Sequence, residues 1–125
     1  PVADVLNRLR GPFNVSAPAQ AAGTAALADK AFIARSRVHN DTWLSWTRIK
    51  LIELGLGVPP GAGNFLLVRF ADGEAAAACD DFLKSRGIIV RRMGAYGLAD
   101  SLRVSIGTEE EMRAFIEAVA DFMKN

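Results

Sequence analysis

The residues of this sequence most able to do chemistry are three arginines in the segment GIIVRRMGAYGLADSLRVSIGT: Arg91, Arg92 and Arg103. A guanidinium binds a carboxylate or a phosphate through two parallel hydrogen bonds, and a strand holds it in a defined direction. Arginines on neighbouring strands could therefore clamp a doubly anionic ligand at two points. Solvated arginines on a sheet face are the commoner outcome, and the residues alone leave both interpretations open.

Arg103 is the strongest candidate because of the face on which its strand places it. In SLRVSIG the apolar side chains alternate with the others, so Arg103 points away from Leu102 and Val104. Its neighbours on that face are small serines, which leave room for a planar anion. Only one of the two adjacent arginines can share this face, and we predict that it is Arg91 if Val90 is buried.

Other reactive residue types lack partners at the spacing their chemistry needs. His39 has no Cys, Asp or Glu spaced to complete a metal site, and no Ser or Cys completes a catalytic triad with it. Cys79 is the single cysteine, which excludes an internal disulfide, and its neighbours predict a small core residue of a helix. Pro1 would need to begin a strand to act as a general base, whereas the residues after it are helical in pattern.

Length and composition are those of one globular domain. The chain has 125 residues, of which 50% are hydrophobic and 23% charged, and its formal net charge is +1. This charge gives no electrostatic case for a nucleic acid or an anionic membrane as partner. No apolar run approaches the ~20 residues of a membrane span, and the first residues lack the pattern of a signal peptide. A cytoplasmic location is expected.

The spacing of apolar residues changes in the middle of the chain, and the elements that must position the arginines lie after this change. The first half predicts helices, including a long one over 29–54, whose broad apolar set suggests more than one partner surface. The second half predicts β-α-β-β-α, with strands at 64–70, 88–92 and 101–107, a helix ending at Gly87 and a last helix opened by a capping box of Thr108 and Glu111. The predicted class is α+β (α/β), with a small mixed three-stranded sheet covered by helices on one face.

Three motifs resemble one enzyme family: RGPFNVSAPAQAAGTAAL, GAGNFLLVRF and GIIVRRMGAYGLADSLRVSIGTEEEMRAFIEAV. Together they resemble the C-terminal third of the histidinol-phosphate aminotransferases, pyridoxal-phosphate enzymes of the aspartate-aminotransferase fold type. The resemblance runs from about Arg10 to Lys124. It implies that residues 1–60 are a helical segment linking to a large cofactor domain absent from this sequence. Residues 61–125 would then be the small α/β domain.

The resemblance also implies roles for four residues. An arginine in the family's LR-(V/I)-(S/T)-(I/V)-G-T strand binds the substrate carboxylate, and this role falls on Arg103. Arg91 matches an arginine near the substrate, and Asn64 and Asn14 match positions close to the site. The implied parent is a cytoplasmic homodimer of histidine biosynthesis, which uses pyridoxal phosphate and acts on an amino or keto acid substrate with a phosphate.

The family's chemistry needs a lysine that forms a Schiff base with the cofactor. The sequence contains four lysines, each in a predicted helix: Lys30, Lys50, Lys84 and Lys124. None lies in the Ser-Lys-then-Gly loop of the family, where the lysine would precede Pro1. We therefore expect a C-terminal fragment that has no catalytic residue of its own, binds no cofactor covalently and is inactive alone.

Two other interpretations use the same residues. The chain could be a non-enzymatic α+β module that senses a small anionic metabolite through Arg103 and Arg91. It could also be a dimerisation piece, in which the long helix with Trp43 and Trp46 packs against a partner. The length of the natural protein would separate these interpretations from the aminotransferase.

Overall fold

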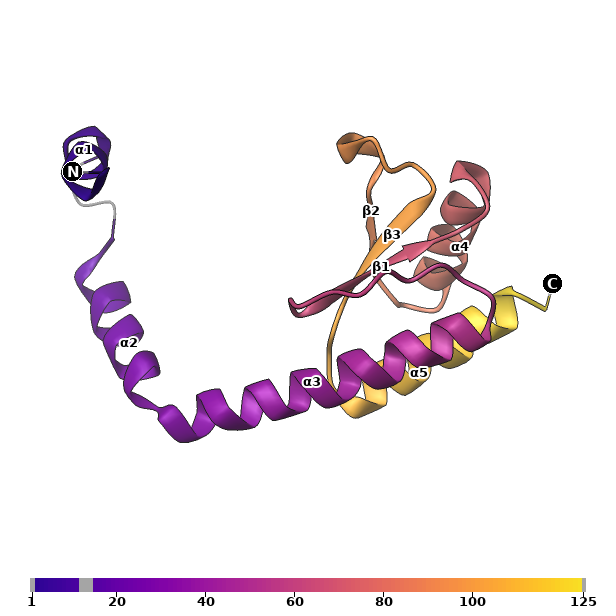
Figure 1. Ribbon diagram of the computed structural model, residues 1–125, viewed down its shortest axis with the longest axis horizontal. Helices are drawn as coiled ribbons and strands as arrows, with labels where there is room; N and C mark the ends of the chain where they lie inside the picture. Colours follow the sequence, from indigo (N-terminus) through magenta and orange to yellow (C-terminus); the bar gives the residue numbers. More distant parts are fainter. Residues whose placement is uncertain (1, 12–14, 125) are drawn as a thin grey trace. The chain divides into compact units, whose positions relative to one another are not determined.

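The computed structural model describes residues 2–11 and 15–124 (Figure 1). Contacts within the chain define two compact units, Pro1–Arg37 and Val38–Asn125. The second unit therefore includes the last part of the long helix as well as the residues that follow it. Asn14, one of the predicted site residues, lies outside the described residues.

The first unit is helical, and none of its described residues is buried. It contains α1 (Val2–Leu9), α2 (Ala17–Ala28) and the start of α3 (Lys30–Glu53). Ser16 caps α2, because its side chain accepts a hydrogen bond from the amide of Ala19. Capping and the helix propensity of alanine thus support α2 without a core. Within residues 2–11 and 15–124, no helix combines the length and apolar character needed to cross a membrane.

The second unit contains the predicted β-α-β-β-α order. After α3 it has β1 (Phe65–Arg69), α4 (Gly73–Ser85), β2 (Arg91–Arg92), the short 3₁₀ helix η1 (Gly94–Tyr96), β3 (Ser101–Ser105) and α5 (Glu109–Phe122). The predicted capping box of α5 is present: the Thr108 amide donates to Glu111 Oε2 at 2.7 Å, and the Glu111 amide donates to Thr108 Oγ1 at 3.3 Å. The α+β class is confirmed.

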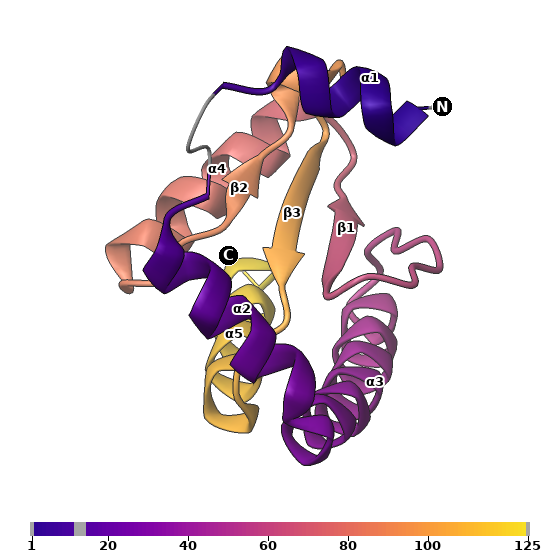
Figure 2. The same ribbon diagram turned by 90° about the vertical axis from the view of Figure 1, so that its left-hand side faces the viewer.

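In the described residues, the sheet has the strand order β1-β3-β2, and both pairs are antiparallel (Figure 2). The prediction of a mixed sheet is therefore wrong, because both strand pairs are antiparallel. The helix α4 connects β1 to β2 so that both run in the same direction, but β3 inserts between them and pairs with each. The second predicted strand is also shorter than 88–92, because residues 88–90 line a cavity instead of pairing.

One face of the sheet forms the core. On β1 and β3, Leu66, Val68, Leu102 and Val104 are at most 3% exposed, and they belong to one apolar cluster with side chains of α3, α4 and α5. Cys79 of α4 is fully buried in this cluster, as predicted. Burial, and then the neighbouring carboxylate of Asp80, raises the pKa of the Cys79 thiol to about 12. The thiol is therefore protonated at neutral pH.

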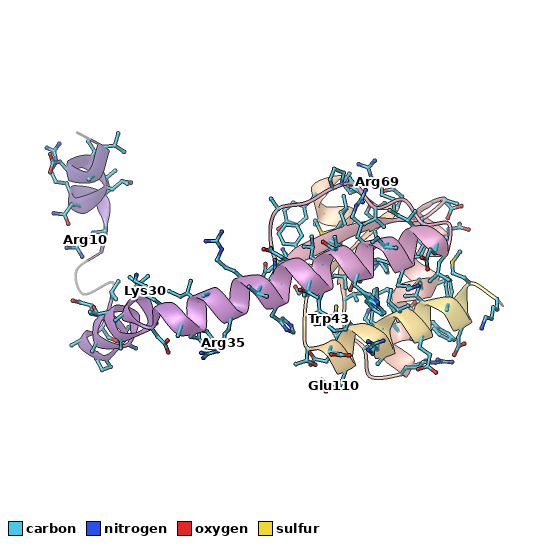
Figure 3. All side chains as sticks on the ribbon, turned by 60° about the horizontal axis from the view of Figure 1, so that its bottom comes forward. Arg10, Lys30, Arg35, Trp43, Arg69 and Glu110 are labelled. Atoms are coloured by element: carbon cyan, nitrogen blue, oxygen red, sulfur yellow. The ribbon has the colours of Figure 1, made fainter. Side chains whose placement is uncertain are left out.

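The helices α3 and α5 meet through aromatic and cationic side chains. The guanidinium carbon of Arg113 lies 5.3 Å from the ring centre of Trp43 and 5.2 Å from that of Trp46. Figure 3 shows Trp43 on the side of α3 that faces α5. Nearby, Nε2 of His39 lies 2.8 Å from the carbonyl oxygen of Gly107 and donates to it. These contacts fix the start of α5, and hence the end of β3, against the long helix.

Candidate anion-binding site

The structure places two of the predicted site residues directly opposite each other. The register of β2 and β3 pairs Arg91 with Arg103, so both side chains lie on the same face of the sheet. Cβ atoms in such a pair are about 4.5–5.5 Å apart. Arg92 pairs with Leu102 and faces the other way, and Val90 is half-buried against the core. The prediction that Arg91 shares the face of Arg103 is confirmed.

Both arginines line a cavity of about 520 Å³ beside the sheet. The chain before β2 and the chain after β3 contribute to its lining, together with the first turns of α5. The pairing of β2 with β3 covers only Arg91 and Arg92, and the residues just before β2 line this cavity together with the end of β3 and the start of α5. The arginines therefore lie where the paired part of the sheet ends and an accessible hollow begins.

Neither guanidinium is neutralised by the protein. Among residues 2–11 and 15–124, no carboxylate oxygen lies within 4.0 Å of a side-chain nitrogen of Arg91 or Arg103, whereas Arg86 and Arg113 each have such a partner. Like charges directly opposite each other on neighbouring strands are destabilising. An exogenous anion between them would relieve this repulsion and accept their free N–H groups.

The two arginines contact aromatic side chains in place of acids. The guanidinium carbon of Arg103 lies 4.8 Å from the ring centre of Phe65, and that of Arg91 lies 5.5 Å from the ring centre of Tyr96. In addition, Nη2 of Arg91 donates a hydrogen bond of 3.2 Å to the Tyr96 hydroxyl. Aromatic faces hold a guanidinium in place but leave its positive charge available for a ligand.

The structure does not bring Asn64 into this cluster. Asn64 precedes β1, its backbone carbonyl accepts a hydrogen bond of 2.8 Å from the amide of Ile106, and its side chain is exposed. It therefore lies at the end of the β1–β3 pairing, next to Phe65, and is not part of the cavity lining. Its role near the substrate stays a prediction, as does that of Asn14.

Phe65 and Tyr96 were not predicted as site residues. A signal for Phe65 exists in the sequence, because the period of β1 places it on the face opposite the buried Leu66 and Val68. Its contact with Arg103 depends on the register, which pairs Phe65 with Ser105. Tyr96 lies in the connection between β2 and β3, and no periodic pattern marks it.

The lysines of the chain do not fit the attachment of pyridoxal phosphate. In the second unit, Lys50, Lys84 and Lys124 lie 2.7, 2.5 and 3.8 Å from carboxylate oxygens of their own helical segments, and none lines the cavity. Lys30 belongs to the first unit, where it begins α3 and is exposed. Within the described residues of the second unit, the arginine pair therefore has no lysine amine beside it that could hold the cofactor. Nor do the described residues bring together three His, Cys, Asp or Glu side chains able to hold a metal ion.

Comparison with known proteins identifies the family. Residues 1–119 match the family model described as aminotransferase class I and II. The chain belongs to this family. The model covers the three sequence motifs and both arginines, so the resemblance seen in the sequence is confirmed at the level of the aminotransferase family.

Two curated relatives are both histidinol-phosphate aminotransferases, a narrower description than that of the family model. The chain is 54% identical over 124 residues to the histidinol-phosphate aminotransferase of Paramagnetospirillum magneticum, and 49% identical over 124 residues to that of Rhodopseudomonas palustris. Each alignment covers 98% of this chain and 34% of the relative. The chain thus spans about a third of the length of the curated relatives it matches.

Solved structures of aminotransferases share its fold. Histidinol-phosphate aminotransferase from Sinorhizobium meliloti, in complex with pyridoxal-5'-phosphate, superposes with a TM-score of 0.87 at 27% identity, over 98% of this chain and 34% of that one. The enzyme from Clostridium acetobutylicum shares the fold at 24% identity, with a TM-score of 0.86, over 99% of this chain and 38% of that one.

Proposed function

We propose that this chain is the C-terminal small domain of a pyridoxal-phosphate-dependent histidinol-phosphate aminotransferase, and that it contributes the substrate-binding arginines. The names of the curated relatives support histidinol phosphate as the substrate of the parent enzyme. Because the chain matches only about a third of their length, we take it to be one part of a larger enzyme. The observation that carries the proposal is the pairing of Arg91 with Arg103 across two strands without an acidic partner among the described residues. Such a pair is suited to carboxylate or phosphate groups.

In this proposal Arg103 binds the carboxylate of the amino or keto acid substrate. It comes from the centre of β3, which is paired on both sides, so its backbone cannot shift without breaking both ladders. A preorganised guanidinium loses less conformational entropy when it binds than a mobile one does. Arg91 adds a second positive charge from an exposed position on the edge strand.

The remaining parts of the machinery belong to the rest of the parent enzyme. The lysine that binds the cofactor would lie in the large domain, because the lysines of this chain do not fit that role. Asn64 and Asn14 would lie near the substrate once that domain is in place. A homodimeric, cytoplasmic parent is part of the same proposal, and it rests on family resemblance alone.

The decisive experiment compares two neighbouring arginines in the full-length enzyme. Arg103→Gln removes the guanidinium on the sheet face that Arg91 shares, whereas Arg92→Gln removes one on the opposite face. With 2-oxoglutarate as the keto acid probe, we expect Arg103→Gln to raise its KM about 100-fold, because loss of one partner of a charge-assisted pair costs about 2–5 kcal/mol. The control Arg92→Gln should change it less than about twofold. Equal, small effects of both changes would contradict the proposal.

A further inference from the structure

Two like charges placed opposite each other need a device that keeps them in position. Arg91 and Arg103 repel each other, and β2 is a two-residue edge strand whose side chains are exposed. Arg103 lies on a central strand and over the ring of Phe65. Arg91 has no such support from the sheet, so in the empty site its side chain would turn toward solvent unless another group held it.

Tyr96 supplies that group. Its hydroxyl accepts a hydrogen bond of 3.2 Å from Nη2 of Arg91, and its ring centre lies 5.5 Å from the guanidinium carbon. One side chain thus gives Arg91 both a directional contact and a contact with an aromatic face. The bond uses one of the five N–H donors of the guanidinium and leaves the others for a ligand.

The position of Tyr96 is set by the backbone of its turn. The amide of Tyr96 donates to the carbonyl of Met93 at 2.9 Å, and the amide of Gly97 donates to that of Gly94 at 3.0 Å. Gly97 has a φ of 74°, a left-handed conformation that favours glycine and reverses the chain there. The amide of Met93 in turn donates to the carbonyl of Ser101 at 3.2 Å, which closes the turn onto β3.

Tyr96 does not act as a core residue. It is 61% exposed, and its only aromatic or cationic ring contact among the described residues is with Arg91. Removal of its hydroxyl should therefore leave the stability of the fold nearly unchanged. A large aromatic side chain left in water, with its polar end directed at one guanidinium, is better explained by that guanidinium than by packing.

We propose that Tyr96 is a positioning residue, which holds the Arg91 guanidinium beside Arg103 so that the pair is ready to bind an anionic substrate group. This inference rests on the function proposed above, because it needs Arg91 to contact a substrate. It assigns to Tyr96 no contact with the reacting atoms. Its effect is to reduce the side-chain entropy that Arg91 loses when the substrate binds.

The test is a double-mutant cycle in the full-length enzyme, with Tyr96→Phe, Arg91→Gln and both changes together. Tyr96→Phe keeps the ring and removes only the hydroxyl. KM and kcat are measured for L-histidinol phosphate and for 2-oxoglutarate, and Arg91→Gln shows which substrate depends on Arg91. We expect Tyr96→Phe to raise the KM of that same substrate about fivefold, with kcat and the thermal unfolding midpoint unchanged.

In the Arg91→Gln background, the change Tyr96→Phe should have no further effect on KM. Four results would overturn the inference: an unchanged KM in Tyr96→Phe, the same rise in both backgrounds, a fall in kcat without a rise in KM, or a lower unfolding midpoint that accounts for the rise in KM. If Arg91→Gln itself leaves both KM values unchanged, the proposed role of Arg91 fails and that of Tyr96 fails with it. A large effect of Arg91→Gln with none from Tyr96→Phe rejects Tyr96 alone.

Discussion

The two faces of the sheet use neighbouring residues for opposite purposes. Leu102 is 1% exposed and packs under the helices, whereas Arg103, the next residue of β3, is half-buried on the other face and pairs with Arg91. Successive side chains of a strand point to opposite faces, so the five residues of β3 can contribute both to the core and to the arginine pair. The covered face carries the free energy of folding, and the other face carries charge that contributes nothing to the core. Stability and binding should therefore respond to different substitutions on the same strand.

The largest expected effect on stability comes from the covered face. Leu102→Ala removes a fully packed side chain from the core and should lower the free energy of unfolding by about 2–5 kcal/mol. Arg103→Gln, one residue away, is the matched control and should change it by less than about 0.5 kcal/mol. Urea unfolding of the chain, followed by circular dichroism, measures both. A comparable loss in the two variants would show that the faces are not separable.

A smaller effect of opposite sign is expected at a polar group on the covered side. Thr47 of α3 is fully buried, and its hydroxyl has no hydrogen-bond partner among the residues that the structure describes. Thr47→Val replaces that hydroxyl by a methyl group of similar size and should stabilise the fold by about 1 kcal/mol. Thr42→Val is the control, because the Thr42 hydroxyl donates to the carbonyl of Val38 at 2.9 Å. Urea unfolding of Thr47→Val with no gain, or with a loss, would indicate that the hydroxyl has a partner in solution.

The smallest effect is expected at the surface of the helix layer, where Arg86 of the α4 C-terminus lies 2.7 Å from Asp121 of α5. The hydrogen bond from Arg86 is the main cause of a lowered pKa at Asp121, to which the charges of Arg86 and Lys124 add, while desolvation opposes it. A carboxyl group whose pKa is lower in the folded state adds stability above its unfolded pKa, and this stability is lost as the pH falls through the folded pKa. Because the pair is exposed to solvent, its contribution is small.

Arg86→Gln should therefore lower the thermal unfolding midpoint slightly at neutral pH, and the difference from the unmodified chain should shrink below about pH 4. Lys50→Gln controls for the loss of one positive charge, since it removes a pair within a single helix. The check is differential scanning calorimetry of the three proteins between neutral and acidic pH. A difference that grows on acidification would have the wrong sign for this carboxyl group.

The fold was largely predictable where its signals are local. Thr108 caps α5 at the position expected of it, because a capping side chain acts on amides two or three residues away. The sheet was less predictable. The pairing of Phe65 with Ser105 joins residues far apart in the chain, and no local pattern shows that β3 rather than β2 lies beside β1. The mixed sheet was expected for that reason.

The candidate site, too, was predictable where its signals are local and unpredictable where it depends on contacts between distant segments. Alternation within one strand predicted that Arg103 points away from the core. The same alternation predicted that Arg91 shares its face if Val90 lies on the core side, and Val90 is half-buried against the core. The absence of an acidic partner for either arginine among the described residues could not be predicted, because any distant carboxylate could have been folded onto them. The contact of Tyr96 with Arg91 likewise depends on the shape of one turn.

By itself, the sequence determined the helices, the extended segments and the side of β3 on which a guanidinium emerges, since these follow from periods and caps that act within a few residues. Tertiary structure alone decided that β3 is central, that Arg91 lies directly opposite Arg103 in the register, and that Tyr96 and Phe65 contact the pair. Those features depend on hydrogen bonds and side-chain contacts between segments distant in the chain, and such contacts exist only when the whole sheet has formed on its helices.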